Sequence, residues 1–156
     1  MLSHSAKSDT GKETFGKMTY KEKVAWLQRY LKAREKANFL GGCVQEMEAE
    51  AQGMRTRLNG VPGAGRDTAR LARSVEKVEE TRKMWNDQLD RCGELRIELV
   101  AELAKIQHPL AQEVLRRRYV MGQNFSEIAE AMGVVQRRAY QLHRTAVEGM
   151  AVPKRA

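Results

Sequence analysis

The chain is poor in the residues that sheet proteins and membrane spans require. Aromatic residues make up only 6% of its 156 residues, and it has three prolines. No apolar run approaches the roughly 20 residues that a transmembrane helix needs. Residues 1–18 have neither the apolar core nor the cleavage site of a secretory signal, and their composition predicts a disordered polar tail. We therefore expect a helical, cytoplasmic protein that has no membrane partner.

Cysteine and histidine are also scarce. Cys43 and Cys92 lie far apart among apolar helical positions, so we expect two reduced thiols that pack as small hydrophobes. The three histidines are scattered, and no Cys/His pair has the spacing of a metal site. No nucleophile is paired with a base, and the acidic residues share helix faces with lysine and arginine. We therefore expect no metal ion, no cofactor, no catalytic residue and no enzyme activity.

What the chain does have is positive charge, in two separate places. The formal net charge is +8. Residues 67–106 are nearly neutral, with eight Lys/Arg against nine Asp/Glu. Residues 19–66 carry nine Lys/Arg against five Asp/Glu, and residues 107–156 carry eight Lys/Arg against four Asp/Glu. An excess of this kind indicates a polyanionic partner.

Two long segments have the 4,3 spacing of coiled-coil seams, which predicts an all-α protein. Thr19 with Glu22 predicts a capping box at the first start, and Gly41-Gly42 inside the run predicts a kink. Asp67 is the predicted N-cap of the second segment. The first seam consists of Trp26, Tyr30, Ala33, Ala37, Leu40, Val44, Met47, Ala51, Met54 and Leu58. The second consists of Leu71, Val75, Val78, Arg82, Trp85, Leu89, Cys92, Arg96, Leu99, Leu103 and Ile106.

The loop between these segments, residues 59–66, contains a proline and several glycines and cannot continue a helix. Each segment predicts a helix of about 40 residues and about 60 Å. An antiparallel hairpin over residues 19–107 buries both seams. Pairing between chains would bury them equally well, and it predicts a homo-oligomer through the coiled coil. If the coiled coil dimerises, removing residues 1–106 should leave the C-terminal part folded but binding its polyanionic partner more weakly.

The remaining part of the chain predicts a three-helix module over residues 108–150, followed by a basic tail, 151–156. Pro109 suits the first turn of a helix. Asn124 and Glu127 have capping-box spacing, and Gly133 predicts a tight turn after the second helix. The module has a small residue at Ala129, a glycine at Gly133 and an apolar pair at Ala139 and Leu142. This spacing is typical of a helix-turn-helix.

The third helix of this module can be divided by angle, at about 100° per residue. The inner face is predicted to hold Val135, Ala139, Leu142 and Ala146, so that burial of Val135 replaces the missing polar cap. The outer face is predicted to contact base edges in the major groove of double-stranded DNA, through Gln136, Arg137, Tyr140, Gln141 and Arg144. Phosphate contacts are predicted for Arg116, Arg117, Arg138, His143, Lys154 and Arg155.

The same residues carry a family resemblance. The stretch "LRRRYVMGQNFSEIAEAMGVVQRRAYQLHRTAVEGM" resembles the C-terminal part of the RinA/ArpU-like phage transcriptional regulators. It is similar, more distantly, to region four of bacterial sigma factors. The resemblance covers most of residues 20–150 and is strongest from about residue 110. It implies DNA binding that regulates transcription of phage late genes in a bacterial host. If host RNA polymerase is a further partner, we expect the protein to act as an accessory activator.

The sequence leaves a second function open. The DNA-recognising small subunit of a phage terminase also couples a helix-turn-helix to helical oligomerisation elements. Promoter binding would favour the regulator, and binding to packaging sites would favour the terminase subunit. A helical adaptor without a DNA role is disfavoured by the basic outer face of the last helix.

Overall fold

The computed structural model describes residues 18–60 and 65–152, and within these ranges every regular element is an α-helix. The predicted all-α fold is therefore confirmed. Most of the predicted tail, the centre of the predicted loop and the two phosphate candidates Lys154 and Arg155 lie outside the described residues. The helices are α1 (Tyr20–Leu27), α2 (Arg29–Leu58), α3 (Gly65–Ala104), α4 (Pro109–Tyr119), α5 (Phe125–Met132) and α6 (Gln136–Gly149).

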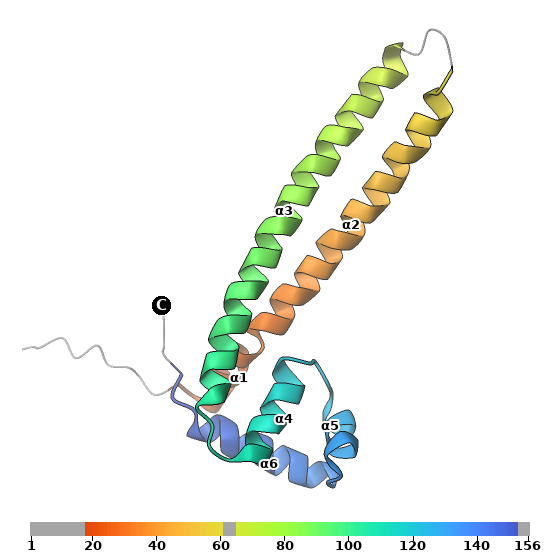
Figure 1. Ribbon diagram of the computed structural model, residues 1–156. Helices are drawn as coiled ribbons and strands as arrows, with labels where there is room; N and C mark the ends of the chain where they lie inside the picture. The colour runs from red at the N-terminus through yellow and green to blue at the C-terminus, as the bar shows by residue number, and fades with distance from the viewer. Residues whose placement is uncertain (1–17, 61–64, 153–156) are drawn as a thin grey trace, which may run out of the picture.

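Helices α2 and α3 lie side by side and antiparallel, and α4, α5 and α6 gather at one end of this hairpin (Figure 1). The seams therefore pack against each other within one chain. Across the hairpin, Arg29 Nη2 lies 2.7 Å from Glu98 Oε2, and Arg82 forms a second ion pair with Glu48. Both pairs are partly exposed, so apolar burial contributes more to the hairpin than they do. None of the described helices is long and apolar enough to cross a membrane.

The first predicted helix is divided in two. Thr19 and Glu22 form the expected capping box at the start of α1. The chain then leaves α1 at Gln28, where the sequence predicted an unbroken helix. At this point Arg29 Nε donates a 3.3 Å hydrogen bond to the Trp26 carbonyl, which belongs to the helical ladder. A side chain bonded into the ladder is a known cause of helix breaks.

Helix α2 runs without a break through Gly41 and Gly42, and the kink there stays a prediction. Gly41 is a contact position. A Cβ at residue 41 would lie 3.0 Å from two carbon atoms of the Trp85 indole, whereas one at Gly42 would meet nothing within 4 Å. The glycine at position 41 therefore lets the two helices approach where α3 places its largest side chain.

The predicted seam of α3 is correct in its first half and shifted by one residue in part of its second. Leu89 and Arg96 are exposed, whereas Leu95 is buried and Gln88 is half-buried. Gln88 Nε2 donates a 3.0 Å hydrogen bond to the Ala33 carbonyl across the hairpin. The shift avoids burying the Arg96 charge, which would carry a large desolvation penalty. Helix α3 also begins at Gly65, so Asp67 lies inside its first turn rather than capping it.

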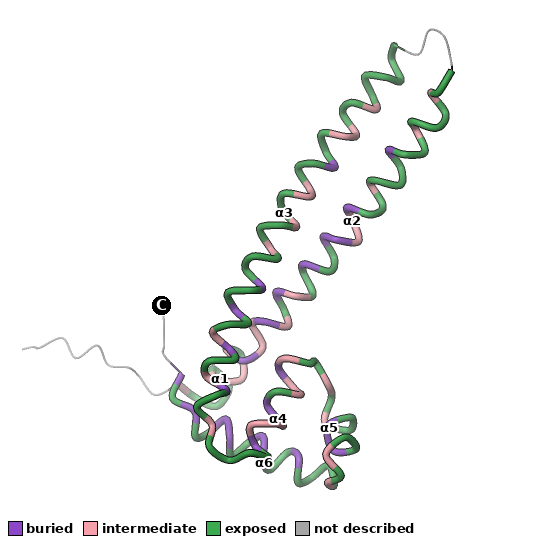
Figure 2. Tube along the Cα trace, in the orientation of Figure 1, coloured by how far each residue is buried: buried purple, intermediate pink, exposed green. Residues whose placement is uncertain are grey.

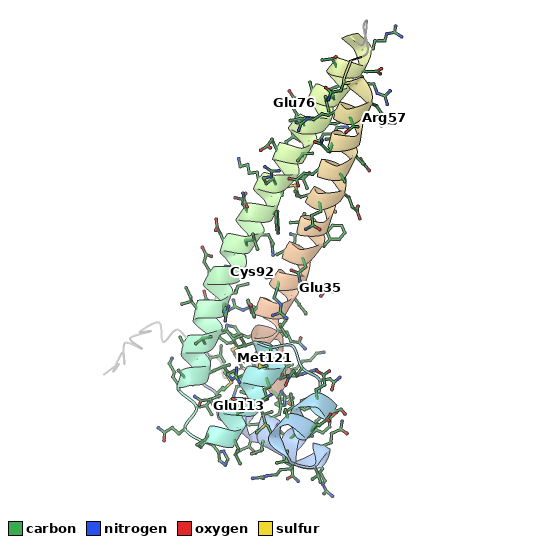
Figure 3. The ribbon with its side chains drawn as sticks, turned by 45° about the vertical axis from the view of Figure 1, so that its right-hand side comes forward. Glu35, Arg57, Glu76, Cys92, Glu113 and Met121 are labelled. Atoms are coloured by element: carbon green, nitrogen blue, oxygen red, sulfur yellow. The ribbon has the colours of Figure 1, made fainter. Side chains whose placement is uncertain are left out.

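One apolar core joins the base of the hairpin to the C-terminal helices. Buried Leu27, Leu99 and Leu103 belong to the same cluster as buried Val114 and Val147. Buried positions are concentrated at this end and thin out toward the far end of the hairpin (Figure 2). The cysteines are free thiols, and burial raises the pKa of Cys92, whose position on α3 is labelled in Figure 3. The base of the hairpin is thus part of the platform that holds the module.

Candidate nucleic-acid interface

Side-chain caps fix the starts of α4 and α5. His108 Nδ1 accepts a hydrogen bond of 3.2 Å from the backbone N–H of Ala111, and Pro109 occupies the first turn of α4. Asn124 Oδ1 accepts a 2.8 Å bond from the N–H of Glu127 at the start of α5. Such caps satisfy backbone donors that the helix itself leaves unpaired. The predicted cap at Asn124 is confirmed.

Gly133 turns the chain between α5 and α6 as the sequence predicted. Its φ of 66° is in the left-handed region, which favours glycine. The N–H of Gly133 bonds the Glu130 carbonyl at 3.3 Å, and the N–H of Val134 bonds the Ala129 carbonyl at 3.0 Å. These two bonds form a Schellman motif. The turn therefore sets the direction in which α6 leaves α5.

Val135 does not point into the core, contrary to the sequence prediction. Its side chain is 72% exposed, and the residue is the N-cap of α6 without a side-chain hydrogen bond. With φ −72° and ψ 150°, its backbone is extended, so the helical angle of 100° per residue does not apply to it. The preceding residue, Val134, is half-buried and packs against the core. Val134 is the apolar anchor at the start of α6.

The rest of the inner face of α6 agrees with the prediction. Ala139, Leu142 and Ala146 are buried, and Val147 is fully enclosed. They pack against α4 and α5 within the shared core. Since these positions fix the rotation of α6 about its axis, they also fix which residues α6 turns to the outside.

His143 was predicted as a phosphate contact, and its burial contradicts that role. It is only 6% exposed. Its Nε2 lies 2.6 Å from the hydroxyl of Tyr119 on α4, and its Nδ1 lies 3.2 Å from the hydroxyl of Tyr20 on α1. A neutral imidazole has one donor and one acceptor, and a phenol can serve as either, so both contacts can be satisfied together. His143 is a buried link among three helices.

The pKa values of this cluster are shifted toward its neutral forms. Burial lowers the pKa of His143 to about 4, and the positive charge of Arg118 acts in the same direction. Burial also raises the pKa of the Tyr119 phenol to about 12. The cluster therefore carries no charge near neutral pH, which suits its place inside the core.

Helix α1 holds α6 from the hairpin side. Besides the contact between Tyr20 and His143, Lys23 Nζ donates a 2.9 Å hydrogen bond to the Glu148 carbonyl. The guanidinium of Arg144 lies 5.4 Å from the centre of the Tyr20 ring, and its Nε is 2.9 Å from Glu148 Oε1. Arg144 is therefore exposed but already engaged by two neighbours.

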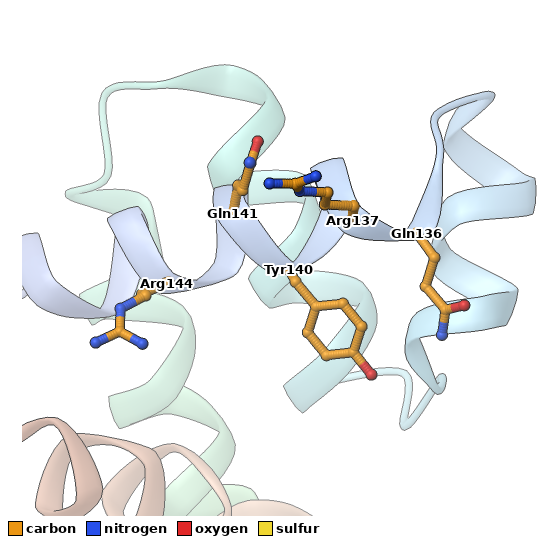
Figure 4. A pocket seen from close by; sticks show the side chains of 5 residues that line it. All are labelled: Gln136, Arg137, Tyr140, Gln141 and Arg144. Carbon is orange, nitrogen blue, oxygen red and sulfur yellow. The ribbon is translucent and has the colours of Figure 1, made fainter.

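The five predicted base-contact residues gather on one exposed face of α6. They line a single open depression, and Figure 4 shows their side chains extending from the helix. Among the described residues, no ion-pair or hydrogen-bond partner is found for the side chain of Arg137 or Gln141. Two polar groups with free donors on an exposed helix face can bind an external ligand. The lining residues are Gln136, Arg137, Tyr140, Gln141 and Arg144.

Tyr140 is positioned by residues that the sequence analysis did not single out. Its ring stacks on Phe125 with the centroids 4.1 Å apart, and the guanidinium of Arg118 lies 4.9 Å from the Phe125 centroid. Arg118 also donates to the Gln123 carbonyl at 3.1 Å. These contacts connect α4 and the start of α5 to the outer face of α6. The aromatic residue next to the Asn124 cap was the one signal in the sequence that could have indicated them.

The predicted phosphate residues differ in how free they are. Arg116 and Arg117 both bond Glu113, at 2.8 Å and 2.7 Å. The hydrogen bond from Arg116 lowers the pKa of Glu113 and raises the pKa of Arg116, so both side chains stay ionised. Arg138 is exposed, and no partner for its side chain is found among the described residues. Arg138 is thus the freest of the predicted phosphate contacts that the structure describes.

Comparison with protein families gives a match within the C-terminal module. Residues 108–150 match the family model described as Sigma-70, region 4. The match covers α4, α5 and α6 and does not include the hairpin. Region 4 is a DNA-binding helix-turn-helix domain, so the match supports DNA binding of the kind found in transcription regulators. The narrower resemblance to RinA/ArpU-like regulators stays a prediction. Comparisons with curated proteins and with solved structures gave no match.

Proposed function

We propose that the protein is a sequence-specific DNA-binding regulator of transcription that inserts α6 into the major groove. The observation that carries the proposal is the exposed face of α6, where Arg137 and Gln141 lie side by side (Figure 4) and their polar groups have no partner among the residues that the structure describes. The match of residues 108–150 to sigma-70 region 4 supports it independently. The protein is proposed to act by binding, without a catalytic step.

The chemistry of this face suits base recognition. Arginine donates two hydrogen bonds to guanine O6 and N7, and glutamine pairs in the same bidentate way with adenine N6 and N7. Arg137 and Gln141 are four residues apart and lie on the same side of α6. Tyr140, whose ring stacks on Phe125, is 49% exposed and lines the same depression. Gln136 and Arg144 complete the contact at its two ends.

Phosphate contacts are proposed around this centre. Arg138 lies on the flank of α6 and is free to approach the DNA backbone. Arg116 and Arg117 form ion pairs with Glu113, so their contribution to phosphate binding is smaller. Such contacts set affinity and its salt dependence rather than sequence preference.

The biological setting follows from the resemblance stated above. We propose that the target is a phage late-gene promoter and that host RNA polymerase is a further partner. A terminase small subunit is the alternative, and it would bind packaging sites instead. Genome-wide mapping of the bound DNA in infected cells separates them. Enrichment at late promoters supports the regulator, and enrichment confined to packaging sites overturns it in favour of the terminase subunit.

The role of α6 can be tested directly with Arg137→Ala. Random duplexes are first selected for binding to the wild-type protein, and the selected duplex is then titrated with both proteins. We expect Arg137→Ala to lose about 1–3 kcal/mol of binding free energy, because one bidentate base contact is removed. The exposed Glu130→Ala on α5 is a control that should bind at least as well as wild type. Equal affinities of Arg137→Ala and wild type would refute α6 as the reading helix.

Self-association is proposed to use the outer face of α3 rather than the predicted seams, which are occupied within one chain. Leu89, Ile97 and Val100 are 45%, 73% and 47% exposed and lie within about 80° of one another on α3. Arg96 borders them on one side and Glu94 on the other, an arrangement that complements itself when two α3 helices pack in parallel. Sedimentation should show a dimer for wild type and a monomer for Ile97→Glu. Monomeric wild type would reject this part of the proposal.

A further inference from the structure

The hairpin ends in a cluster of arginines far from the helix-turn-helix. Between residues 52 and 74 the sequence has five arginines, no lysine and a single acid, Asp67. In contrast, residues 74–104 of α3 carry eight Asp/Glu against five Lys/Arg. The positive excess of the first long segment is therefore gathered at the hairpin tip. The tip arginines are Arg55, Arg57, Arg66, Arg70 and Arg73.

All five tip arginines are exposed in the structure. Within the described part of the chain, one ion pair is found for these arginines, between Arg70 and Asp67 at 4.0 Å, which is long for such a contact. Figure 3 labels Arg57 near the far end of the hairpin. On α3, Arg66, Arg70 and Arg73 are spaced 4 and 3 residues apart and so share one face. Unlike Arg29 and Arg82 lower in the hairpin, they do not stabilise the helix pair.

The two helices bring some of these charges together. Arg57 of α2 and Arg70 of α3 line the same surface depression of about 250 Å³, together with Met54, Leu58 and Asp67. Two guanidinium groups and a single carboxylate line this depression, so it keeps a net positive charge that a bound anion would offset. The planar fork of arginine matches phosphate oxygens, and its weak hydration makes it the preferred side chain for nucleic-acid backbones.

We propose that the hairpin tip is a second, sequence-independent DNA-binding site that holds the phosphate backbone of double-stranded DNA. The inference goes beyond the proposed function of α6, since it assigns a nucleic-acid contact to a part of the chain outside the matched residues 108–150. Helix α3 has 40 residues, so the tip lies about 60 Å along the hairpin from its base. That length corresponds to about 18 base pairs of duplex. The tip therefore binds DNA outside the site that α6 reads.

DNA is favoured over an acidic protein because the same chain carries a helix-turn-helix. Once α6 is bound, DNA is present near the tip at high effective concentration. The phosphates can belong to flanking DNA of the same molecule, bent toward the hairpin, or to a second duplex. Both sources present the same backbone chemistry, and the experiment separates them.

The test compares the full-length protein with the variant Arg57→Gln, Arg66→Gln, Arg70→Gln, Arg73→Gln. The matched control removes the same charge from exposed positions of the hairpin body, with Lys32→Gln, Lys36→Gln, Lys83→Gln and Arg91→Gln. The probes are 20- and 60-base-pair duplexes of arbitrary sequence, titrated at several salt concentrations. A third variant, Arg137→Ala with Arg138→Ala, disables α6 and reports separately on the proposed function.

We expect the tip variant to bind the 60-base-pair duplex at least about tenfold more weakly at low salt than the body control. The slope of log affinity against log salt should fall by about 0.9 for each lost phosphate contact. If the effect grows with duplex length, the tip holds flanking DNA. If instead the protein joins a labelled duplex to an immobilised one and the tip variant does not, it holds a second duplex.

Equal duplex binding and equal bridging by the tip variant and the body control would overturn the proposal. It would also be overturned if the tip variant kept its duplex affinity but lost binding to poly-L-glutamate, which would assign the tip to an acidic protein. A failure of the α6 proposal would instead appear as unchanged binding of the selected duplex by the Arg137→Ala, Arg138→Ala variant. Circular dichroism of each variant confirms that the helices remain folded.

Discussion

Tyr119 on α4 and His143 on α6 share a buried hydrogen bond, with 2.6 Å between the phenol oxygen and Nε2 of the imidazole. A second phenol, that of Tyr20 on α1, lies 3.2 Å from Nδ1 of the same ring. The imidazole of His143 therefore connects the base of the hairpin to two helices of the DNA-binding module. The orientation of α6 depends on the hairpin through this contact and through the shared apolar core.

Acid should destabilise the protein through His143. Its pKa is lowered to about 4 in the folded protein by burial, with Arg118 acting in the same direction, against about 6.5 in the unfolded chain. Folding therefore excludes a proton, and the stabilisation is present above pH 6.5 and is lost as the pH falls toward about 4. Chemical denaturation at pH 7.5, 6.0 and 5.0 should show the free energy of unfolding falling by up to about 1.4 kcal/mol per pH unit below 6.5.

The variant His143→Gln is the control for this pH dependence. Glutamine can bond both phenols but does not titrate, so its unfolding free energy should change much less between pH 7.5 and 5.0. Glu113, whose pKa is lowered by its hydrogen bond from Arg116, titrates below that window and does not interfere. An equally steep loss of stability in His143→Gln would show that other groups cause it.

Replacing Val135 should stabilise the protein, whereas replacing its neighbour should not. Val135→Ser adds a side-chain oxygen at an uncapped N-cap and removes an exposed valine, so we expect a gain of about 0.5–2 kcal/mol. Val134→Ser removes a side chain that packs against the core, and we expect a loss of stability. Thermal unfolding followed by circular dichroism compares the two. A larger loss for Val135→Ser than for Val134→Ser would restore Val135 as the inner anchor.

The adjacent glycines of α2 should respond to alanine with opposite signs. Gly42→Ala meets only open space in a helix interior, so we expect stabilisation of about 0.5–1 kcal/mol. Gly41→Ala places its Cβ against the Trp85 indole, and we expect this crowding to cost about 1–3 kcal/mol. The midpoints of urea denaturation measure the difference. Equal stabilisation by both would mean that Trp85 moves aside without cost.

Removing residues 1–106 should destabilise the module, although the sequence alone suggested that it would remain folded. The deletion takes Leu27, Leu99 and Leu103 out of the core that packs against α4 and α6. Tyr20 is lost from His143 as well. We expect residues 107–156 to melt at a lower temperature and less cooperatively than the full chain, as followed by calorimetry.

A shortened hairpin provides the control for this deletion. Joining Val44 to Trp85 through a short glycine-serine linker removes the tip but retains Tyr20 and the base leucines. Its module should melt close to the temperature of the full chain. A module of residues 107–156 as stable as the full chain would show that the shared core contributes nothing.

The sequence by itself determined the local elements and most of the candidate site. The caps at Thr19 and Asn124 and the turn at Gly133 depend on neighbours within one turn of helix, and all are found where predicted. The exposed face of α6 follows from helical periodicity alone, so Arg137 and Gln141 were correctly placed on it. These features need no knowledge of the distant parts of the chain.

Only the tertiary structure decided which surfaces face each other. His143 is enclosed because α1, at the base of the hairpin, packs against α6, and Val135 is exposed because its backbone is extended. The seam of α3 shifts to Leu95 because the alternative would bury the charge of Arg96. The basic tip forms because the hairpin brings Arg57 beside Arg70. Each of these outcomes depends on contacts between residues far apart in the chain, which a local pattern does not contain.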